Sequence, residues 1–277
     1  MAKRGAEKIE TEVGARSDHV QSVERALNLL EALSDDEEGF RLTDLARITG
    51  LSPSTAHRLL TTLEHRNFVQ FDHTMSVWHI GRQAFSVGSA FARRRNFVAP
   101  ALPYLRRLRD VTRETANLGI VDDGGMVVLV QAESREIMRA ITRVGGRAPL
   151  VASGMGKAIL ATYSTEDVAD VVSRYGMTRL TPKTLTRASD LRAELKTIAQ
   201  QGYAVDDEET APGLRCVAAV VFNHMAEPLC AISVSGLSAR MTKERVPQLG
   251  QLVANTALEL TELLGGIVPE NHRIKPA

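Results

Sequence analysis

Residues 50–60 read Gly-Leu-Ser-Pro-Ser-Thr-Ala-His-Arg-Leu-Leu, and this stretch has the features of a tight turn followed by a helix start. Ser52 belongs to the residue types that cap helix N-termini, and Pro53 stands at the first helical position, where its missing N–H costs nothing. Apolar residues continue at helical spacing as far as Leu63. The sequence therefore predicts a helix over 53–65 with one apolar and one polar face.

The polar face of this helix carries short hydroxyl side chains around one arginine. Serine, threonine and arginine contact both phosphate oxygens and base edges, and a bidentate arginine on guanine is the commonest specific base contact. A solvent-exposed helix rich in serine and threonine would look similar, but the capped turn before it and the hairpin expected after it favour DNA reading. The candidate DNA contacts are Ser52, Ser54, Thr55, His57, Arg58, Thr61 and Thr62, together with Arg25 and Arg41 from the preceding segment.

The segments on either side complete a winged helix-turn-helix. Upstream, apolar residues at helical spacing predict a helix from Val23 and a second one over 43–49, with Thr43 as the N-cap of the second. Downstream, two strand-like runs at 68–71 and 77–80 are close enough to form a hairpin. Three helices followed by a hairpin is the order of elements in a winged helix-turn-helix.

Charge is distributed unevenly along the chain. The net charge is only +1, which says nothing about a nucleic-acid partner. Residues 41–95, however, hold eight arginines against three acidic residues, a local charge of about +5. A basic patch is the expected footprint of a DNA-binding surface, although charge alone fits an ordinary solvated face equally well. The acidic residues at 35–38 argue against non-specific coating of DNA.

The chain from about residue 97 onward has the pattern of a larger α+β unit. Asp123-Gly124-Gly125 is a strong hairpin signal, and strands in adjacent hairpins interrupted by helices indicate one antiparallel sheet flanked by helices. The predicted strands cover 116–122, 126–133, 137–143, 203–207, 215–223 and 228–235. The predicted helices cover 98–114, 153–161, 165–174, 189–201 and 242–264.

A glycine-containing segment precedes the second of these helices. It is not a phosphate loop, because that motif needs a glycine where Val151 stands and a serine or threonine at Ala158. With Ser153 as N-cap, the amides of Gly154 and Met155 would be free to bind an anion such as a small carboxylate. A plain helix start in a loop is the simpler reading of this segment by itself.

Polar residues at strand positions are the other candidates for a binding site. Ser233 and Ser235 are two residues apart on a predicted strand, so their hydroxyl groups face the same side. Taken one at a time, each serine reads as an ordinary strand hydroxyl and Cys216 as an inert buried thiol. Asp206, taken by itself, is better explained as one member of the solvated acidic run 206–209.

Catalysis, metal binding and secretion are not indicated. The two cysteines lie in apolar runs, which suggests a reducing compartment, and neither a signal peptide nor a membrane span is evident. If 215–223 is one strand, His224 lies about 26 Å from Cys216, too far for a catalytic pair. No cluster has metal-ligand spacing. We therefore expect a cytoplasmic protein that is not an enzyme and needs no cofactor or metal.

Several stretches together resemble the IclR family of transcriptional regulators. The helix-turn-helix resemblance lies in residues 21–27, 42–46 and 50–60 and in the wing at 77–81. A second set, at 203–209, 212–219 and 231–236, resembles the effector domain of the same family. The resemblance covers about residues 20–265. It implies a winged helix-turn-helix that dimerises, a linker helix and a GAF/PAS-like effector domain with an antiparallel sheet flanked by helices.

The resemblance also implies a ligand and partners. In relatives that bind small 2-oxo acids, matching positions line the ligand site, and glyoxylate is the leading effector here, with pyruvate next. The implied polar or backbone contacts are Gly154, Met155, Asp206, Cys216, Ser233 and Ser235, and the implied apolar wall is Ile137, Ala140 and Leu214. The implied partners are double-stranded operator DNA and further copies of the chain, as dimers of dimers. A dimeric DNA-bending or scaffolding protein without a ligand is the alternative.

The expected domain organisation follows from these assignments. It comprises a disordered tail at 1–16, the DNA-binding and dimerisation domain at 17–80, a linker helix at 81–96, the effector domain at 97–268 and a tail at 269–277.

Overall fold

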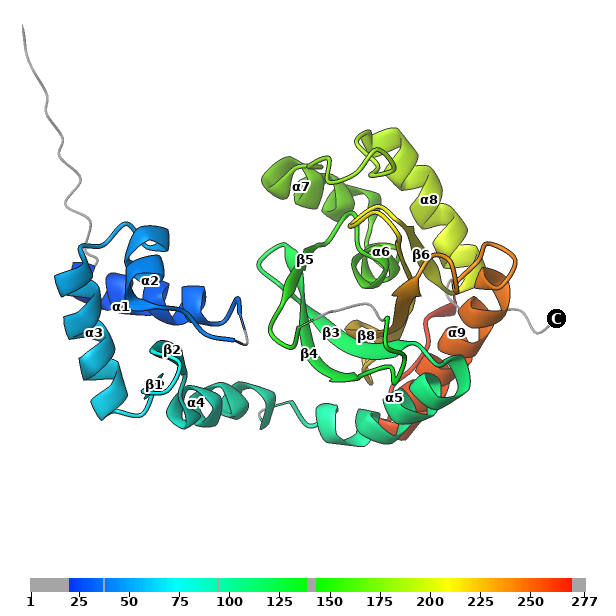
Figure 1. The fold of residues 1–277 in the computed structure, drawn as a ribbon. Coiled ribbons are helices and arrows are strands. Elements are labelled where there is room, and N and C mark those ends of the chain that lie inside the picture. The colour runs from blue at the N-terminus through cyan, green and yellow to red at the C-terminus, as the bar shows by residue number, and fades with distance from the viewer. Residues whose placement is uncertain (1–19, 37, 94, 139–142, 271–277) are drawn as a thin grey trace, which may run out of the picture. The chain divides into compact units, whose positions relative to one another are not determined.

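The computed structural model describes residues 20–36, 38–93, 95–138 and 143–270. These residues form two compact units, divided between Phe91 and Ala92 (Figure 1). The predicted tail at 1–16 and most of that at 269–277 lie outside the described residues, as does Ala140. Within the described part of the chain, no helix is long and apolar enough to cross a membrane.

The first unit is a three-helix bundle with a two-stranded hairpin. Its helices are α1 (Gln21–Leu33), α2 (Leu42–Ile48) and α3 (Pro53–His65). Strands β1 (Val69–Asp72) and β2 (Val77–Ile80) pair antiparallel, and α4 (Arg82–Arg93) follows. The shared core includes the buried side chains of Leu29, Leu33, Leu45, Leu60 and Trp78. The unit has the predicted winged helix-turn-helix order.

Helices α3 and α2 begin with different N-terminal hydrogen bonds. Ser52 Oγ accepts a hydrogen bond of 3.3 Å from the Thr55 amide, and Pro53 occupies the first turn, so α3 spans the predicted 53–65. The predicted cap at Thr43 is wrong, because α2 begins at Leu42 and the N-cap is Arg41, whose carbonyl accepts from the amides of Asp44 and Leu45 one turn further on. Backbone bonding alone starts this helix, with no side-chain cap.

The second unit is built on a six-stranded antiparallel sheet with the order β5-β4-β3-β8-β7-β6. The strands are β3 (Thr115–Asp122), β4 (Gly125–Ala132), β5 (Arg147–Pro149), β6 (Ala204–Asp207), β7 (Leu214–Phe222) and β8 (Pro228–Leu237). The helices are α5 (Val98–Thr112), α6 (Gly154–Leu160), α7 (Thr165–Tyr175), α8 (Ala188–Gln201) and α9 (Val246–Leu263). Figure 1 shows α5 and α9 on one side of the sheet and α6 with α8 on the other.

Two hydrophobic cores cover the two faces of this sheet. Along β7, Val217 and Ala219 belong to the core shared with α5 and α9. Cys216 and Ala218, which alternate with them along the strand, belong to the core shared with α6 and α8. Because strand side chains alternate between faces, every second residue of β7 and β8 points toward α6. That face holds the candidate effector residues.

Two predicted elements of this unit differ from the structure. The strand predicted at 137–143 is absent from its described residues, 137, 138 and 143, and residues 139–142 lie outside the described part. The strand at this edge of the sheet is instead β5. It follows a turn at Gly145, whose φ of +82° favours glycine. The last helix begins at Val246 rather than 242. Pro247 has no amide to donate, so it fits the first turn but not the interior of a helix.

The hairpin signal at residues 123–125 is confirmed. Asp123 and Gly124 both have positive φ, +41° and +73°, and form a two-residue turn between β3 and β4. Such a turn matches the twist of the strands it joins.

Candidate DNA interface and effector site

The polar face of α3 is available for contact. Ser52, Ser54, His57, Arg58, Thr61 and Thr62 are exposed, and so is Arg41, whereas Thr55 and Arg25 are half-buried. The Ser52 hydroxyl lies 2.9 Å from Thr55 Oγ1 and 3.1 Å from Ser54 Oγ, so these groups form one cluster at the helix start. Thr62 donates to the Arg58 carbonyl at 2.8 Å, which leaves its hydroxyl only as an acceptor.

An open pocket of about 930 Å³ lies beside α3 and is lined by residues of α2, α3 and the wing, which is the β1–β2 hairpin with its turn. Its polar lining includes Arg41, His57 and Thr61 from the helical side and His73 and Thr74 from the wing. These side chains can donate hydrogen bonds to phosphate oxygens, as DNA backbone contacts require. Arg41 and His57, two of the predicted DNA contacts, are thereby brought together with the wing.

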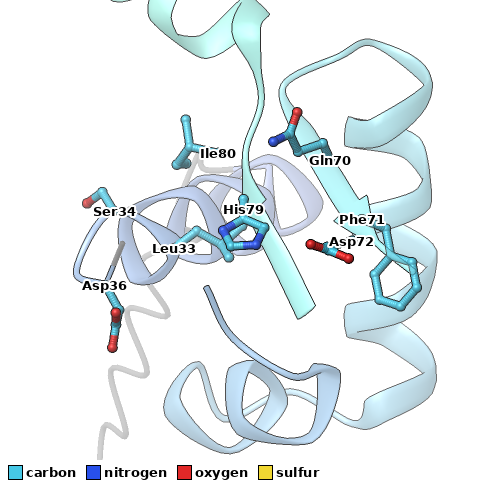
Figure 2. Close-up of a pocket in the computed structure, with 8 residues that line it drawn as sticks. All are labelled: Leu33, Ser34, Asp36, Gln70, Phe71, Asp72, His79 and Ile80. Atoms are coloured by element: carbon cyan, nitrogen blue, oxygen red, sulfur yellow. The ribbon is translucent and has the colours of Figure 1, made fainter. Parts of the chain in front are cut away.

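A second pocket, of about 750 Å³, lies between the end of α1 and the hairpin (Figure 2). Its lining includes the carboxylates of Asp36 and Asp72. The backbone amides of Met75 and Thr74 donate to Asp72 and lower the pKa of its carboxyl group, so this residue stays negatively charged. The pocket beside α3 is lined by one carboxylate residue, Glu64, together with Arg41, so it suits phosphate better than a pocket with two carboxylates.

In the second unit, the predicted polar residues line up across the sheet. Asp206, Cys216 and Ser235 stand opposite one another on β6, β7 and β8. The neighbouring row contains Ser233 of β8 opposite Asn117 of β3. Asp206 is 2% exposed, Cys216 8%, Ser233 0% and Ser235 5%, so the row is buried.

The start of α6 meets this row. Ser153 Oγ accepts from the Gly156 amide at 3.1 Å, which confirms Ser153 as the N-cap. Among the described residues, the amides of Gly154 and Met155 have no hydrogen-bond partner. A Cβ placed on Gly154 would lie 3.1 Å from Cys216 Sγ, so glycine at this position lets the helix approach the thiol. Gly154 and Cys216 are therefore neighbours across the site.

Cys216 is a neutral thiol at this position. Burial raises the pKa of its thiol to about 11, although the neighbouring hydroxyl groups of Ser235 and Ser233 act in the opposite direction. Ser235 stands directly opposite Cys216 in the β7–β8 pairing, and Ser233 lies two residues away on the same face. A thiol that stays protonated is a poor nucleophile, and it presents no negative charge to an anionic ligand.

The carboxylate of Asp206 accepts hydrogen bonds from the loop that follows β6. Its Oδ1 accepts from the amides of Glu209 at 2.7 Å and Thr210 at 3.3 Å, and its Oδ2 accepts from the Thr210 hydroxyl at 2.5 Å. Burial raises the pKa of the Asp206 carboxyl group, while these hydrogen bonds lower it. A ligand contact from Asp206 would have to use lone pairs that the loop leaves free.

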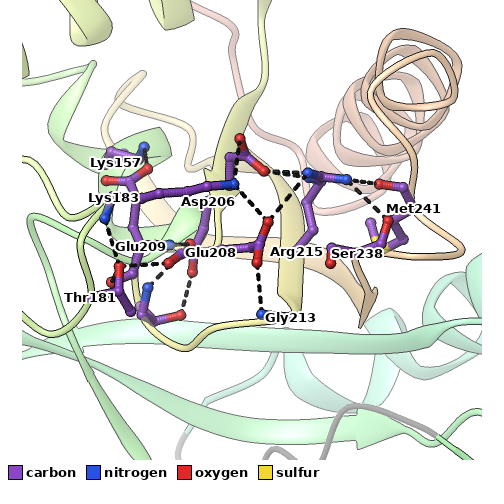
Figure 3. Close-up of polar contacts among 12 residues, drawn as sticks. Lys157, Thr181, Lys183, Asp206, Glu208, Glu209, Gly213, Arg215, Ser238 and Met241 are labelled. Atoms are coloured by element: carbon purple, nitrogen blue, oxygen red, sulfur yellow. Dashed lines mark hydrogen bonds and ion pairs between the residues drawn. The ribbon is translucent and has the colours of Figure 1, made fainter.

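The acidic run 206–209 is not the fully solvated run of its simplest interpretation (Figure 3): Asp206 and Glu209 are buried, and Asp207 and Glu208 are half-buried. Glu209 pairs with the fully buried Lys157, and Asp207 pairs with the guanidinium of Arg215. Glu208 is held by Lys183 at 2.6 Å and by the Gly213 amide at 2.8 Å. Lys183 also lies 3.4 Å from Asp207, so Asp207 and Glu208 share a cation, and the network connects β6 to α6 and β7.

Of the three residues predicted to form an apolar wall of the effector site, only Leu214 is partly buried. Leu214 is half-buried at the first position of β7, opposite Leu237. Ile137 is 97% exposed, so it forms no buried wall in this arrangement. Ala140 lies outside the described residues.

Asn117 belongs to the site but was not among the predicted residues. It is 1% exposed, and its Nδ2 lies 3.4 Å from Ser233 Oγ and 3.3 Å from Ser235 Oγ. Its Oδ1 has no hydrogen-bond partner among the residues that the structure describes. The available sequence signal was a single amide residue inside the otherwise apolar run 116–121, but strand pairing was needed to connect it with the serines.

Comparison with known proteins agrees with both units. The chain matches the family model for the bacterial transcriptional regulator IclR C-terminal domain over residues 89–262 and that for the IclR helix-turn-helix domain over residues 22–73. The transcriptional repressor IclR of Escherichia coli K12 is 40% identical over 268 residues, covering 96% of this chain and 97% of the relative. The HTH-type transcriptional regulator BhcR of Paracoccus denitrificans is 40% identical over 242 residues, covering 87% of this chain and 86% of the relative. The crystal structure of Thermotoga maritima IclR, at 26% identity, has a TM-score of 0.75 and covers 89% of this chain and 100% of its own.

A helix-turn-helix unit followed by an effector domain defines a DNA-binding transcriptional regulator that responds to a small molecule. The relatives are transcriptional regulators and not enzymes, as the sequence predicted. The chain belongs to the IclR family of bacterial transcriptional regulators.

Proposed function

We propose that this chain binds operator DNA through α3 and the wing, and that a small 2-oxo carboxylate controls this binding from the site between α6 and the sheet. Glyoxylate is the first candidate and pyruvate the second. The observation that carries the proposal is the convergence of two buried serine hydroxyls with two unpartnered amides, those of Gly154 and Met155. A carboxylate, which only accepts hydrogen bonds, matches a set of donors.

Similarity alone does not select the effector, because the Escherichia coli and Paracoccus relatives are described only as transcriptional regulators. The packing around these residues favours a small ligand. A Cβ on Gly154 would lie 3.1 Å from Cys216 Sγ and 3.6 Å from Ala218 Cβ, and Cys216 and Ala218 belong to one buried core. A neutral Cys216 thiol is compatible with an anion beside it.

For DNA, we assign specificity to Arg58 and positioning to the hydroxyl groups and Arg41. An arginine on a recognition helix can bond guanine through two nitrogens, whereas serine and threonine hydroxyls reach phosphates. Ser54, Thr61 and His57 are exposed on the same polar face. The domain boundaries expected from the sequence, with a linker helix at 81–96, are part of this proposal.

The proposed assembly is a dimer, and a dimer of dimers on the operator. Helix-turn-helix proteins read two half-sites with matching symmetry. Val23 and Leu27, four residues apart on α1, are 54% and 52% exposed, and Phe85 on α4 is 77% exposed. A second copy of this chain would cover that apolar surface. The ligand would bind one arrangement of the subunits better than another, which shifts DNA affinity in the cytoplasm.

The test is fluorescence anisotropy on DNA from upstream of the chain's own gene and its neighbours, at one fixed salt concentration because phosphate contacts are salt-dependent. Specific binding that shifts with glyoxylate supports both parts of the proposal. Specific binding that neither glyoxylate nor pyruvate changes would refute the ligand class and favour a ligand-free scaffolding protein. Failure to bind any genomic fragment specifically would refute the assignment of α3.

A further inference from the structure

We infer that Asn117 sets the hydrogen-bond polarity of the effector site: it holds both serine oxygens as acceptors, so that both hydroxyl hydrogens are left to donate to the ligand's carboxylate. This inference rests on the proposed function and makes Asn117 a positioning and specificity-determining residue. Asn117 is not among the residues that the sequence predicted to contact the ligand.

The geometry is that of one amide serving two hydroxyl groups. Asn117 stands opposite Ser233 in the β3–β8 pairing, and Ser235 follows two residues later on the same face. The distances from Asn117 Nδ2 are 3.4 Å to Ser233 Oγ and 3.3 Å to Ser235 Oγ. Since all three side chains are at most 5% exposed, bulk water does not compete for these groups.

A count of hydrogens gives the polarity. The Asn117 amide group has two N–H donors, and each serine hydroxyl has one donor and two lone pairs. When each serine oxygen accepts one N–H from Asn117, each hydroxyl hydrogen must turn toward a different acceptor. The neighbouring Cys216 sulfur is only a weak acceptor. Two O–H donors are therefore available next to the start of α6.

The charges around the serines agree with this polarity. Lys157, the fully buried cation of α6, already pairs with Glu209 and with Glu194 at 3.3 Å. Recognition of an anion would thus come from neutral donors rather than from a cation. Asn117 Oδ1 is itself buried and finds no partner within the described part of the chain. A buried unpaired acceptor is unusual, and a hydroxyl group of a hydrated carbonyl or a water molecule would satisfy it.

Replacing Asn117 with aspartate tests the inference, because the two side chains have the same shape. An aspartate at this position accepts from both serines, which turns their lone pairs toward the ligand and adds a negative charge. Isothermal titration calorimetry of the full chain would compare glyoxylate and pyruvate with their primary amides. For N117D we expect carboxylate affinity to fall about a hundredfold or more, and the preference between carboxylate and amide to reverse.

Asn117→Ala is the companion variant, since it frees the serine hydroxyls to rotate without adding charge. We expect its preference for the carboxylate over the amide to shrink about tenfold without reversing. If N117D does not fold, as judged by circular dichroism, this ratio in N117A decides the question. DNA binding without ligand serves as the check that each variant is otherwise intact.

The outcomes separate this inference from the proposed function. If the unmodified chain binds neither carboxylate, the proposed ligand class is wrong, and the inference is overturned with it before any variant is made. If the unmodified chain binds a carboxylate, and folded N117D or N117A keeps the same ratio of carboxylate to amide affinity, only the role of Asn117 is overturned. A reversed ratio in N117D supports it, because loss of structure alone would weaken both ligands together.

Discussion

The buried ammonium group of Lys157 contacts the carboxylate of Glu209, and this ion pair connects α6 to the loop that follows β6. The Lys157 side chain is 0% exposed and that of Glu209 is 8% exposed. Burial raises the pKa of the Glu209 carboxyl group, although the charge of Lys157 lowers it. Asp206 caps the same loop through the Glu209 amide, so the ion pair supports the loop next to the candidate effector site.

Removing the cation of this pair should destabilise the second unit. Lys157→Met leaves Glu209 buried and unpaired, and we expect the free energy of unfolding to fall by about 3–5 kcal/mol. Urea unfolding followed by far-ultraviolet circular dichroism measures this. Lys196→Met, at an exposed position of α8, is the matched control and should have little effect. A loss below about 1 kcal/mol for Lys157→Met would contradict a buried ion pair.

Arg58 should carry DNA specificity. Arg58→Ala removes an exposed side chain from α3, so the fold should be retained while affinity for the operator falls by about 1–3 kcal/mol or more and discrimination between operator and random DNA shrinks. Anisotropy on both DNAs measures the ratio. Arg187→Ala, which removes the same charge from an exposed site beside Asp190 in the second unit, should leave the ratio unchanged. Operator binding at the original affinity in the Arg58 variant would show that α3 is not the recognition helix.

The hydroxyl of Ser52 should stabilise the first unit. Ser52→Ala removes the cap of α3, and we expect a loss of about 1 kcal/mol. The chain has one tryptophan, and Trp78 is buried in the first unit, so its fluorescence follows unfolding there. Ser86→Ala, at an exposed position of α4, is the control. Equal stability of the two variants would mean that the Ser52 cap contributes nothing.

Ser233 and Ser235 should be needed for the response to ligand and not for DNA binding. The double change to alanine removes two hydroxyl donors from the site and leaves α3 intact, so operator binding without glyoxylate should stay the same while its shift with glyoxylate disappears. Anisotropy titrations with increasing ligand measure both quantities. Ser189→Ala, at an exposed position of α8, serves as the control. A normal shift in the double variant would place the ligand elsewhere.

Cys216 should react slowly with thiol reagents. Its pKa is raised by burial to about 11 from 9.0, so near neutral pH its thiolate fraction is about a hundredfold lower than that of an exposed cysteine. Because only the thiolate reacts, the labelling rate should rise about tenfold per pH unit up to the raised pKa. Burial raises the pKa of Cys230 as well. Alkylation by iodoacetamide, followed by mass spectrometry, measures both sites; rapid labelling of Cys216 in the folded chain near neutral pH would contradict its burial.

Local signals made much of the fold predictable. The Ser52-Pro53 start placed α3 at its observed bounds, and the Asp123-Gly124 turn placed the β3–β4 hairpin, because capping and turn geometry depend on residues close in sequence. The errors arose where local signals were weak or competing. Thr43 had the residue type of a cap but not its position, and β5 is a short edge strand defined by its pairing with β4.

The site divides in the same way. The sequence by itself determined the helix-turn-helix, the polar face of α3, the cap at Ser153 and the shared side of Ser233 and Ser235, since each depends on periodicity or on neighbours within a few residues. Only the tertiary structure placed Asn117 beside both serines, Gly154 against Cys216, and Lys157 with Glu209. These contacts join residues that are far apart in the chain, and strand register and helix packing, which no local pattern specifies, bring them together.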